Sequence, residues 1–275
     1  MSCAYLESVR RYTECRLQRL SQEALLADLD PAVVDFTDNF DGSCTEPAVL
    51  PARIPQLLVN GSQGIAVGIA TKIPPHNLTE VVDAMKALIA DSELSNEALH
   101  AYVPGPDFPT GGLLLAGPGI LSTYETGKGS MTLRSKVSIE AGRGNREVIV
   151  VTELPYQVFK AQVITEIAEL VDKGTLEGIA DIQDESDRRG MRISIEVKRT
   201  ADAGVVLNNL MKHTRLQTRF SANMVALVDH KPEQMTLKGM LNEFINFRVE
   251  VRSTVTLPGL ALAVFLPQAR RNQGV

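Results

Sequence analysis

The residues best suited to covalent chemistry are a tyrosine and an arginine side by side in Arg11-Tyr12-Thr13-Glu14. A phenol has a pKa of about 10, so only on the order of one molecule in a thousand is ionised at pH 7. A neighbouring cation favours the phenolate and stabilises negative charge that develops on a substrate. The pair therefore suits nucleophilic catalysis by Tyr12. A tyrosine taken alone is more often structural.

A second candidate is the glycine-rich segment 57–71, LLVNGSQGIAVGIAT. Gly64 and Ala66 flank Ile65, and small residues allow a backbone to approach a ligand closely. The segment lacks the lysine and the Ser/Thr of a phosphate-binding P-loop, so we expect no ATP site in it. Taken alone, the pattern favours the alternative that Ile65 is one residue of a buried strand.

Charged and metal-binding residue types give weaker indications. Arg53 and Lys72 flank the glycine-rich segment and could meet phosphates, but a solvated surface charge explains each nearly as well. His76 is expected to order the turn before the next helix. The four histidines are scattered and the three cysteines lack a CxxC spacing, so no metal site is predicted, and the odd cysteine count fits a reducing compartment.

The composition is that of an ordinary soluble globular chain, with 44% apolar and 22% charged residues in 275. The net charge of −5 argues mildly against a general nucleic-acid binder, so any DNA contact must be local. The arginines at positions 10, 11, 16 and 19 make the N-terminal twenty residues the obvious place for it. We expect no membrane span, because no apolar run reaches about eighteen residues.

Hydrophobic periodicity and turn residues predict a mixed α+β fold. An N-cap at Asn77 predicts one helix. The other expected helices cover residues 7–29, 160–173, 203–212 and 236–250. The expected strands form two pairs, 130–140 with 146–153 and 178–183 with 191–198, and a further strand lies near 224–229.

Several long motifs place the chain beside a known family. They are RYTE at 11–14, LLVNGSQGIAVGIATKIPPHNL at 57–78, PGPDFPTGG at 104–112, VTELPYQ at 151–157 and DESDRRGMRI at 184–193. The chain resembles the A subunits of type IIA DNA topoisomerases, the gyrase and topoisomerase IV class, and gyrase more than topoisomerase IV. The resemblance covers roughly residues 10–250.

The resemblance implies roles for the candidate residues. Tyr12 would attack a DNA phosphate, and Arg11 would assist it, in an ATP-dependent enzyme that changes supercoiling through a transient phosphotyrosine link. Gly64, Ile65 and Ala66 would lie against DNA, with Ile65 as an apolar wedge that enters between base steps and bends the duplex.

The resemblance also implies four parts. Residues 1–36 would be the remnant of a winged-helix domain, 37–235 a tower domain with the DNA-lining segment, 236–250 the start of a coiled-coil helix, and 251–275 a divergent tail. Pro258 and Gly259 predict that the helix ends before this tail.

Cofactors and partners follow from the same resemblance. The chain itself would hold none, because Mg²⁺ and ATP would be bound by the B subunit of gyrase. The partners would be DNA, the B subunit, and a second copy of the A subunit, in the bacterial cytoplasm or in a chloroplast or mitochondrion. The isolated chain is expected to be inactive without the missing regions and its B-type partner. A catalytically inert truncated fragment with the tower fold is the alternative.

Overall fold

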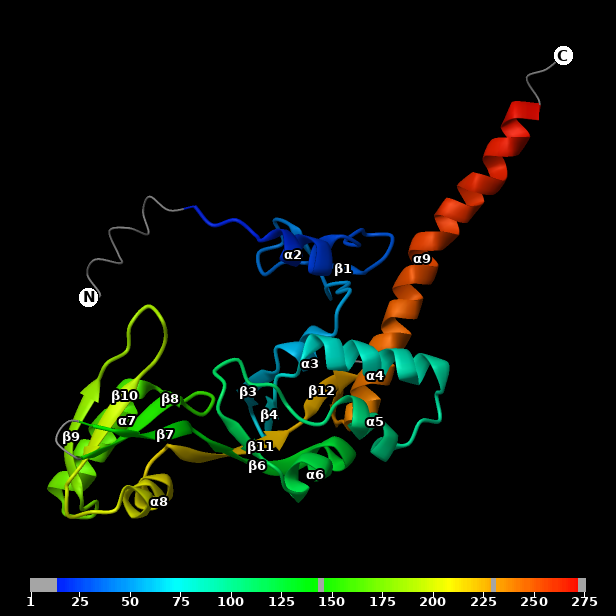
Figure 1. The fold of residues 1–275 in the computed structure, drawn as a ribbon. Helices are drawn as coiled ribbons and strands as arrows, with labels where there is room; N and C mark the ends of the chain where they lie inside the picture. Colours follow the sequence, from blue (N-terminus) through cyan, green and yellow to red (C-terminus); the bar gives the residue numbers. More distant parts are fainter. Residues whose placement is uncertain (1–13, 143–145, 229–230, 272–275) are drawn as a thin grey trace. The chain divides into compact units, whose positions relative to one another are not determined.

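A computed structural model describes residues 14–142, 146–228 and 231–271, the last sixteen of these by their backbone alone. The chain divides into two compact units (Figure 1). The first comprises Met1–Gln56 with Glu243–Val275, and the second comprises Leu57–Asn242. Helices and strands are mixed throughout, which confirms the predicted α+β class. The expected division into four parts differs from these two units and stays a prediction.

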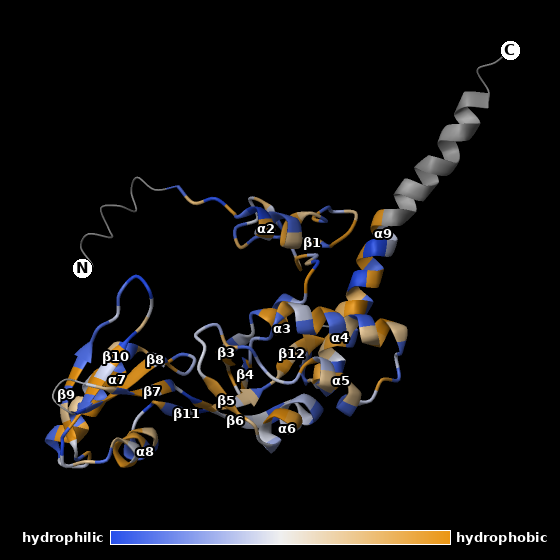
Figure 2. Ribbon diagram, viewed as in Figure 1, coloured by the Kyte–Doolittle hydropathy of each residue, from blue (hydrophilic) through white to orange (hydrophobic). Residues whose placement is uncertain are grey.

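A four-stranded antiparallel sheet forms one end of the second unit. Its strands, in spatial order, are β7 (Lys136–Ala141), β8 (Glu147–Glu153), β10 (Ile193–Val197) and β9 (Ile179–Asp184). Helices α7 (Lys160–Asp172) and α8 (Ala203–His213) cover it, and Figure 2 shows β8 and β10 mostly in hydrophobic colours. The core between sheet and helices includes Ile149, Val151, Val163, Ile167, Ile193, Ile195, Val206 and Leu210.

The rest of the second unit contains a five-stranded sheet. Its order is β3 (Ser62–Ala66), β4 (Ile69–Ile73), β11 (Gln217–Asn223), β6 (Lys128–Arg134) and β5 (Leu113–Leu115). The other elements are α3 (Gln56–Val59), α4 (Leu78–Ala90), α5 (Asn96–Tyr102), α6 (Pro118–Thr126), β12 (Val225–Val228) and β13 (Lys231–Gln234). As predicted, Asn77 caps α4, because its side chain accepts a hydrogen bond from Thr79 N.

The first unit is smaller and contains a short helical segment and a strand pair. Its elements are α2 (Arg19–Ser21), η1 (Gln22–Leu26), β1 (Phe36–Asp38), β2 (Thr45–Pro47) and α9 (Leu237–Arg271) from Glu243 onward. The predicted helix end near residue 250 is wrong, since α9 continues to Arg271. A proline removes one backbone hydrogen bond of a helix, and α9 continues past Pro258 despite that loss.

The helix expected over 7–29 is also shorter than predicted within the described residues. Residues 14–18 are not helical, and helical backbone begins at Arg19. Leu17 and Leu20, two of the apolar residues in this range, are exposed. A short helix gains most of its stability from packing its apolar face, and these two side chains have no such packing.

The strand predicted over 130–140 is two strands in different sheets. β6 pairs with β11 and β5, whereas β7 pairs with β8, and Ser135 lies between them. Ser135 is buried, and its N–H donates to Leu216 O at 2.8 Å. The alternation of side chains is continuous across this point, so the sequence did not reveal the change of sheet. The predicted pairing holds for β7 with β8.

His76 lies buried where the chain turns into α4, in agreement with the expected ordering role. Its Nδ1 lies 3.0 Å from Leu58 O and its Nε2 lies 3.0 Å from the Tyr124 hydroxyl. Because a carbonyl only accepts, Nδ1 donates to Leu58 and Nε2 accepts from Tyr124. Burial lowers the pKa of His76 from 6.5 to about 4, and burial raises the pKa of Tyr124.

This lowered pKa predicts acid sensitivity of the fold. Neutral His76 is favoured in the folded chain, whereas His76 of the unfolded chain gains a proton near pH 6.5. The free energy of unfolding is therefore highest above pH 6.5 and decreases as the pH falls toward 4. The loss amounts to about 3 kcal/mol in the free energy of unfolding. Denaturant unfolding should therefore show that the free energy of unfolding of the wild type falls by about 3 kcal/mol more than that of His76→Gln between pH 6.5 and pH 4. Parallel pH profiles for the two proteins would contradict it.

Candidate functional site

The glycine-rich segment forms a tight β-hairpin. β3 and β4 pair antiparallel from Ser62↔Ile73 to Ala66↔Ile69, and Val67-Gly68 join them. Gly68 has a φ of +77°, and no atom lies within 4 Å of the place where a Cβ would stand, so the backbone angle rather than space favours glycine there. The hairpin thus carries its two strands out to a short, sharply turned tip.

The two faces of the hairpin differ, because alternate residues of a strand point to opposite sides. Gln63 and Ile65 share one face with their cross-strand partners Lys72 and Ala70. Gly64, Ala66, Ile69 and Thr71 share the other face. The predicted site residues Gly64, Ile65, Ala66 and Lys72 are therefore brought together in one hairpin, with Ile65 and Lys72 on the same side.

Ile65 is fully accessible. Its exposed fraction is 90%, and that of Val67 at the tip is 103%. The alternative that Ile65 is buried in a strand is therefore wrong. Gly64 has no positive φ, and a Cβ there would meet only the Thr71 methyl at 3.8 Å, so the chain's own folding does not require glycine at this position. Close approach of a ligand backbone remains a physical reason for it.

The opposite face of the hairpin is held against β12. The Thr71 hydroxyl donates to Val225 O at 2.7 Å. Beside this contact lies a groove of about 380 Å³ with mostly apolar walls, which include Ile69, Leu227 and Pro232. One face is thus attached to β12 through Thr71, whereas the Ile65 side chain stays exposed.

Lys72 lies near the base of the hairpin. Its ammonium is 4.5 Å from the centroid of the Phe220 ring on β11, a cation–π contact. Asn223 of β11 is its neighbour in the sheet. The contact fixes a positive charge on the Ile65 face, where it could meet a phosphate.

Arg53 belongs to the first unit and has a different environment. Its guanidinium binds the carboxylate of Asp28 at 2.5 Å, and Arg248 of α9 binds the same carboxylate at 3.1 Å. The hydrogen bond from Arg53 is the main cause that lowers the pKa of Asp28. Arg53 therefore joins two segments of the first unit, and its proposed phosphate contact stays a prediction.

Comparison with known proteins relates most of the chain, and not only the hairpin, to one protein family. Residues 6–256 match the family model that describes the A subunits of DNA gyrase and topoisomerase IV. The chain belongs to this family. It is 57% identical over 244 residues to the DNA gyrase A subunit of Synechocystis, and 54% identical over 243 residues to the chloroplastic/mitochondrial DNA gyrase A subunit of Arabidopsis thaliana.

The match covers most of this chain and a minor part of each relative. It includes 87% and 88% of the chain, but 28% and 26% of the Synechocystis and Arabidopsis proteins. The gyrase A subunit of Clostridium acetobutylicum gives the same picture, with 49% identity over 29% of its length. The chain therefore spans about a quarter to a third of the family members it matches.

Arg11 and Tyr12 lie outside the described residues, so their geometry stays a prediction. In the described part of the chain, no group of three or more histidine, cysteine or acidic side chains could hold a metal ion. The search of the described helices found none long and apolar enough to cross a membrane.

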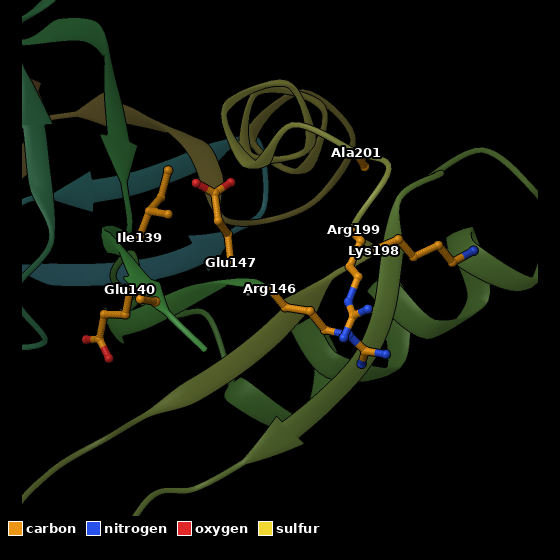
Figure 3. Close-up of a pocket in the computed structure, with 8 residues that line it drawn as sticks. Ile139, Glu140, Arg146, Glu147, Lys198, Arg199 and Ala201 are labelled. Atoms are coloured by element: carbon orange, nitrogen blue, oxygen red, sulfur yellow. The ribbon is translucent and has the colours of Figure 1, made fainter. Parts of the chain in front are cut away.

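A second hollow, of about 370 Å³, lies on the four-stranded sheet (Figure 3). Arg146 and Arg199 extend into the same region, and Lys198 points away from them (Figure 3). Arg146 is paired with Glu196 at 3.2 Å, and two further glutamates line the walls. The mixed charges give no single-sign field for a polyanion.

Sequence reasoning missed two side chains that bind each other, Gln63 in the hairpin and Gln157 beside it. Neither residue type carries a signal in the sequence, because glutamine is common on any surface. Phe220, which supports Lys72, was missed with the whole of β11.

Proposed function

We propose that this chain is the DNA-cleaving part of a type IIA DNA topoisomerase A subunit of the gyrase kind. The phenolic oxygen of Tyr12 attacks a backbone phosphorus and forms a phosphotyrosine bond, while the bond to a deoxyribose oxygen breaks. The phenol gives up its proton, and the departing sugar oxygen gains one. Religation reverses these steps and needs no ATP, because the phosphotyrosine retains the energy of the broken bond.

The hairpin is the observation that carries the proposal. A side chain that enters a DNA step must be exposed, apolar and carried by a firmly held strand, and Ile65 meets these conditions. Ile65 is 90% exposed on β3, and β3 pairs with β4, which is bonded to β12 through Thr71. Small neighbours at 64 and 66 let the strand approach the duplex closely.

Insertion of Ile65 would unstack one base step at a cost of a few kcal/mol and bend the duplex. Lys72, on the same face, could contact a phosphate near that step. Arg11 would stabilise both the Tyr12 phenolate and the charge on the phosphoryl oxygens. In this proposal Ile65 bends the duplex, Lys72 contacts a phosphate near the bend, and Tyr12 with Arg11 cuts the strand.

The remaining assignments follow from the family. We propose three partners, which are DNA, the B subunit of gyrase and a second copy of the A subunit. Mg²⁺ and ATP would be bound by the B-type partner, where ATP hydrolysis would drive the change in supercoiling. Bacterial and chloroplastic/mitochondrial relatives are similarly close, so the proposed compartment is the bacterial cytoplasm or one of these organelles.

The test compares two forms of the protein on supercoiled plasmid with Mg²⁺. The isolated chain should give no covalent adduct, because it spans about a quarter of its relatives and the B subunit is absent. The same chain, extended to the length of its relatives and assembled with the B subunit, should give adduct and supercoiling. An extended, assembled protein without adduct would contradict the proposed DNA cleavage.

A further inference from the structure

The turn after β8 contains an unusual backbone conformation. Val158 N donates to Pro155 O at 3.1 Å, so Tyr156 and Gln157 occupy the two central positions of a β-turn. Gln157 has a φ of +66°, and no other non-glycine among the described residues has a positive φ. A positive φ at the second central position, with a negative φ at the first, defines a type II turn, in which glycine or asparagine is preferred at that second position. A residue with a Cβ is strained there, so another interaction must offset that cost.

The side chain of Gln157 makes such an interaction. Its Nε2 donates to the Oε1 of Gln63 at 2.7 Å, across 94 positions of sequence. Gln63 lies on β3 two residues before Ile65, and residues two apart on a strand share a face. The strained turn therefore reaches the base of the hairpin on the same face as the proposed wedge.

The turn itself is anchored by its other central residue. The Tyr156 ring lies 5.3 Å from Phe108 and 6.5 Å from Phe220, measured between centroids. Phe220 also carries the Lys72 ammonium. Tyr156, Phe220 and Lys72 line a hollow of about 130 Å³, together with Gln63 and Gln157.

The base of the hairpin is thus held on both strands. Gln157 binds Gln63 on β3, and Phe220 supports Lys72 on β4, directly opposite Gln63 in the register. A wedge that forces base pairs apart is pushed back by the duplex. The contacts of Gln63 and Lys72 at the base of the hairpin resist that force, because they keep β3 and β4 from tilting.

We propose that Gln157 is a positioning residue that clamps the base of the hairpin and holds Ile65 at the angle needed to enter a duplex DNA step. The inference rests on the proposed function. It differs from a plain turn role, which would require only the backbone, and from a direct contact between Gln157 and DNA, which would not require Gln63.

Gln157→Gly separates the clamp from a plain turn role. It relieves the strained φ, which would favour the turn, but it removes the amide that binds Gln63. The experiment uses the full-length A subunit in complex with the B subunit, in a Tyr12→Phe background, so that DNA bending is measured by energy transfer between labelled duplex ends without cleavage. Because loss of one hydrogen bond to a neutral partner is a modest effect, we expect the bent fraction relative to unbent to fall about threefold to tenfold. The thermal midpoint should stay equal or rise, since the strain is gone.

A double-mutant cycle with Gln63→Ala completes the test. Each single change should reduce bending, and the double variant should bend no less than either one. If Gln157→Gly bends DNA as its parent does, Gln157 is only a turn residue. If the two losses add in the double variant, Gln157 and Gln63 contact the duplex separately. Either result overturns the clamp. The proposed function is judged apart from this, by adduct formation in the protein that keeps Tyr12.

Discussion

Replacing Tyr12 by phenylalanine will abolish the covalent link between protein and DNA in the assembled enzyme. The change removes one oxygen, and that oxygen is the proposed nucleophile, so adduct and supercoiling should fall by at least about a thousandfold. Binding of duplex DNA should stay within about twofold, because the ring and Arg11 are kept. Adduct is measured by trapping with denaturant, and binding by titration of a labelled duplex.

A matched control is Tyr102→Phe, which removes the same atom from an exposed tyrosine of α5. It should leave adduct, supercoiling and binding at wild-type levels. A trapped adduct in Tyr12→Phe would show that another side chain is the nucleophile. Equal losses in both variants would show that the assay reports something other than the reacting oxygen.

Replacing Ile65 by alanine will reduce cleavage and leave it measurable. The change shortens the wedge without removing a reactive atom, so the bend weakens and the cleavage-competent complex is populated less. A wedge effect of about 1–3 kcal/mol corresponds to roughly tenfold to a hundredfold in adduct yield. DNA bending, measured by energy transfer between labelled duplex ends, should fall together with adduct.

Ile89→Ala is the control for this change, because Ile89 on α4 is also an exposed isoleucine, at 70%. The control should bend and cleave DNA as wild type does. Since Ile65 is 90% exposed, Ile65→Ala should also leave the thermal midpoint unchanged. Normal bending by Ile65→Ala would exclude the wedge.

The elements with strong local signals were predicted well. α7 (Lys160–Asp172) matches the helix predicted over 160–173, and Gly174, just beyond its end, has a φ of +72°. β9 and β10 pair as predicted, because the alternation of their side chains buries one face on the core. In these places the local pattern and the packing require the same conformation.

The failures occur where distant parts of the chain decide the structure. β11 has the mixed sequence QTRFSAN and no apolar run, and it exists because its backbone pairs with all of β6. The strand predicted over 130–140 is split because β11 pairs with only its first part. Propensity carries no information about such partners.

The candidate site was predicted in part. The hairpin residues were named from the sequence, but whether Ile65 is buried or exposed was decided only by the fold, since glycine-rich apolar segments occur in both settings. Gln157 could not be predicted, because its positive φ is imposed by the turn and its partner Gln63 is 94 residues away.

The most direct test identifies the attachment point in a trapped protein–DNA adduct. The full-length A subunit that carries this chain is assembled with the B subunit, reacted with duplex DNA and Mg²⁺, trapped with denaturant, and digested with nuclease and protease before mass spectrometry. The account predicts a nucleotide joined through phosphate to the phenolic oxygen of Tyr12. A nucleotide on any other residue, or no linked peptide from the assembled enzyme, would contradict it.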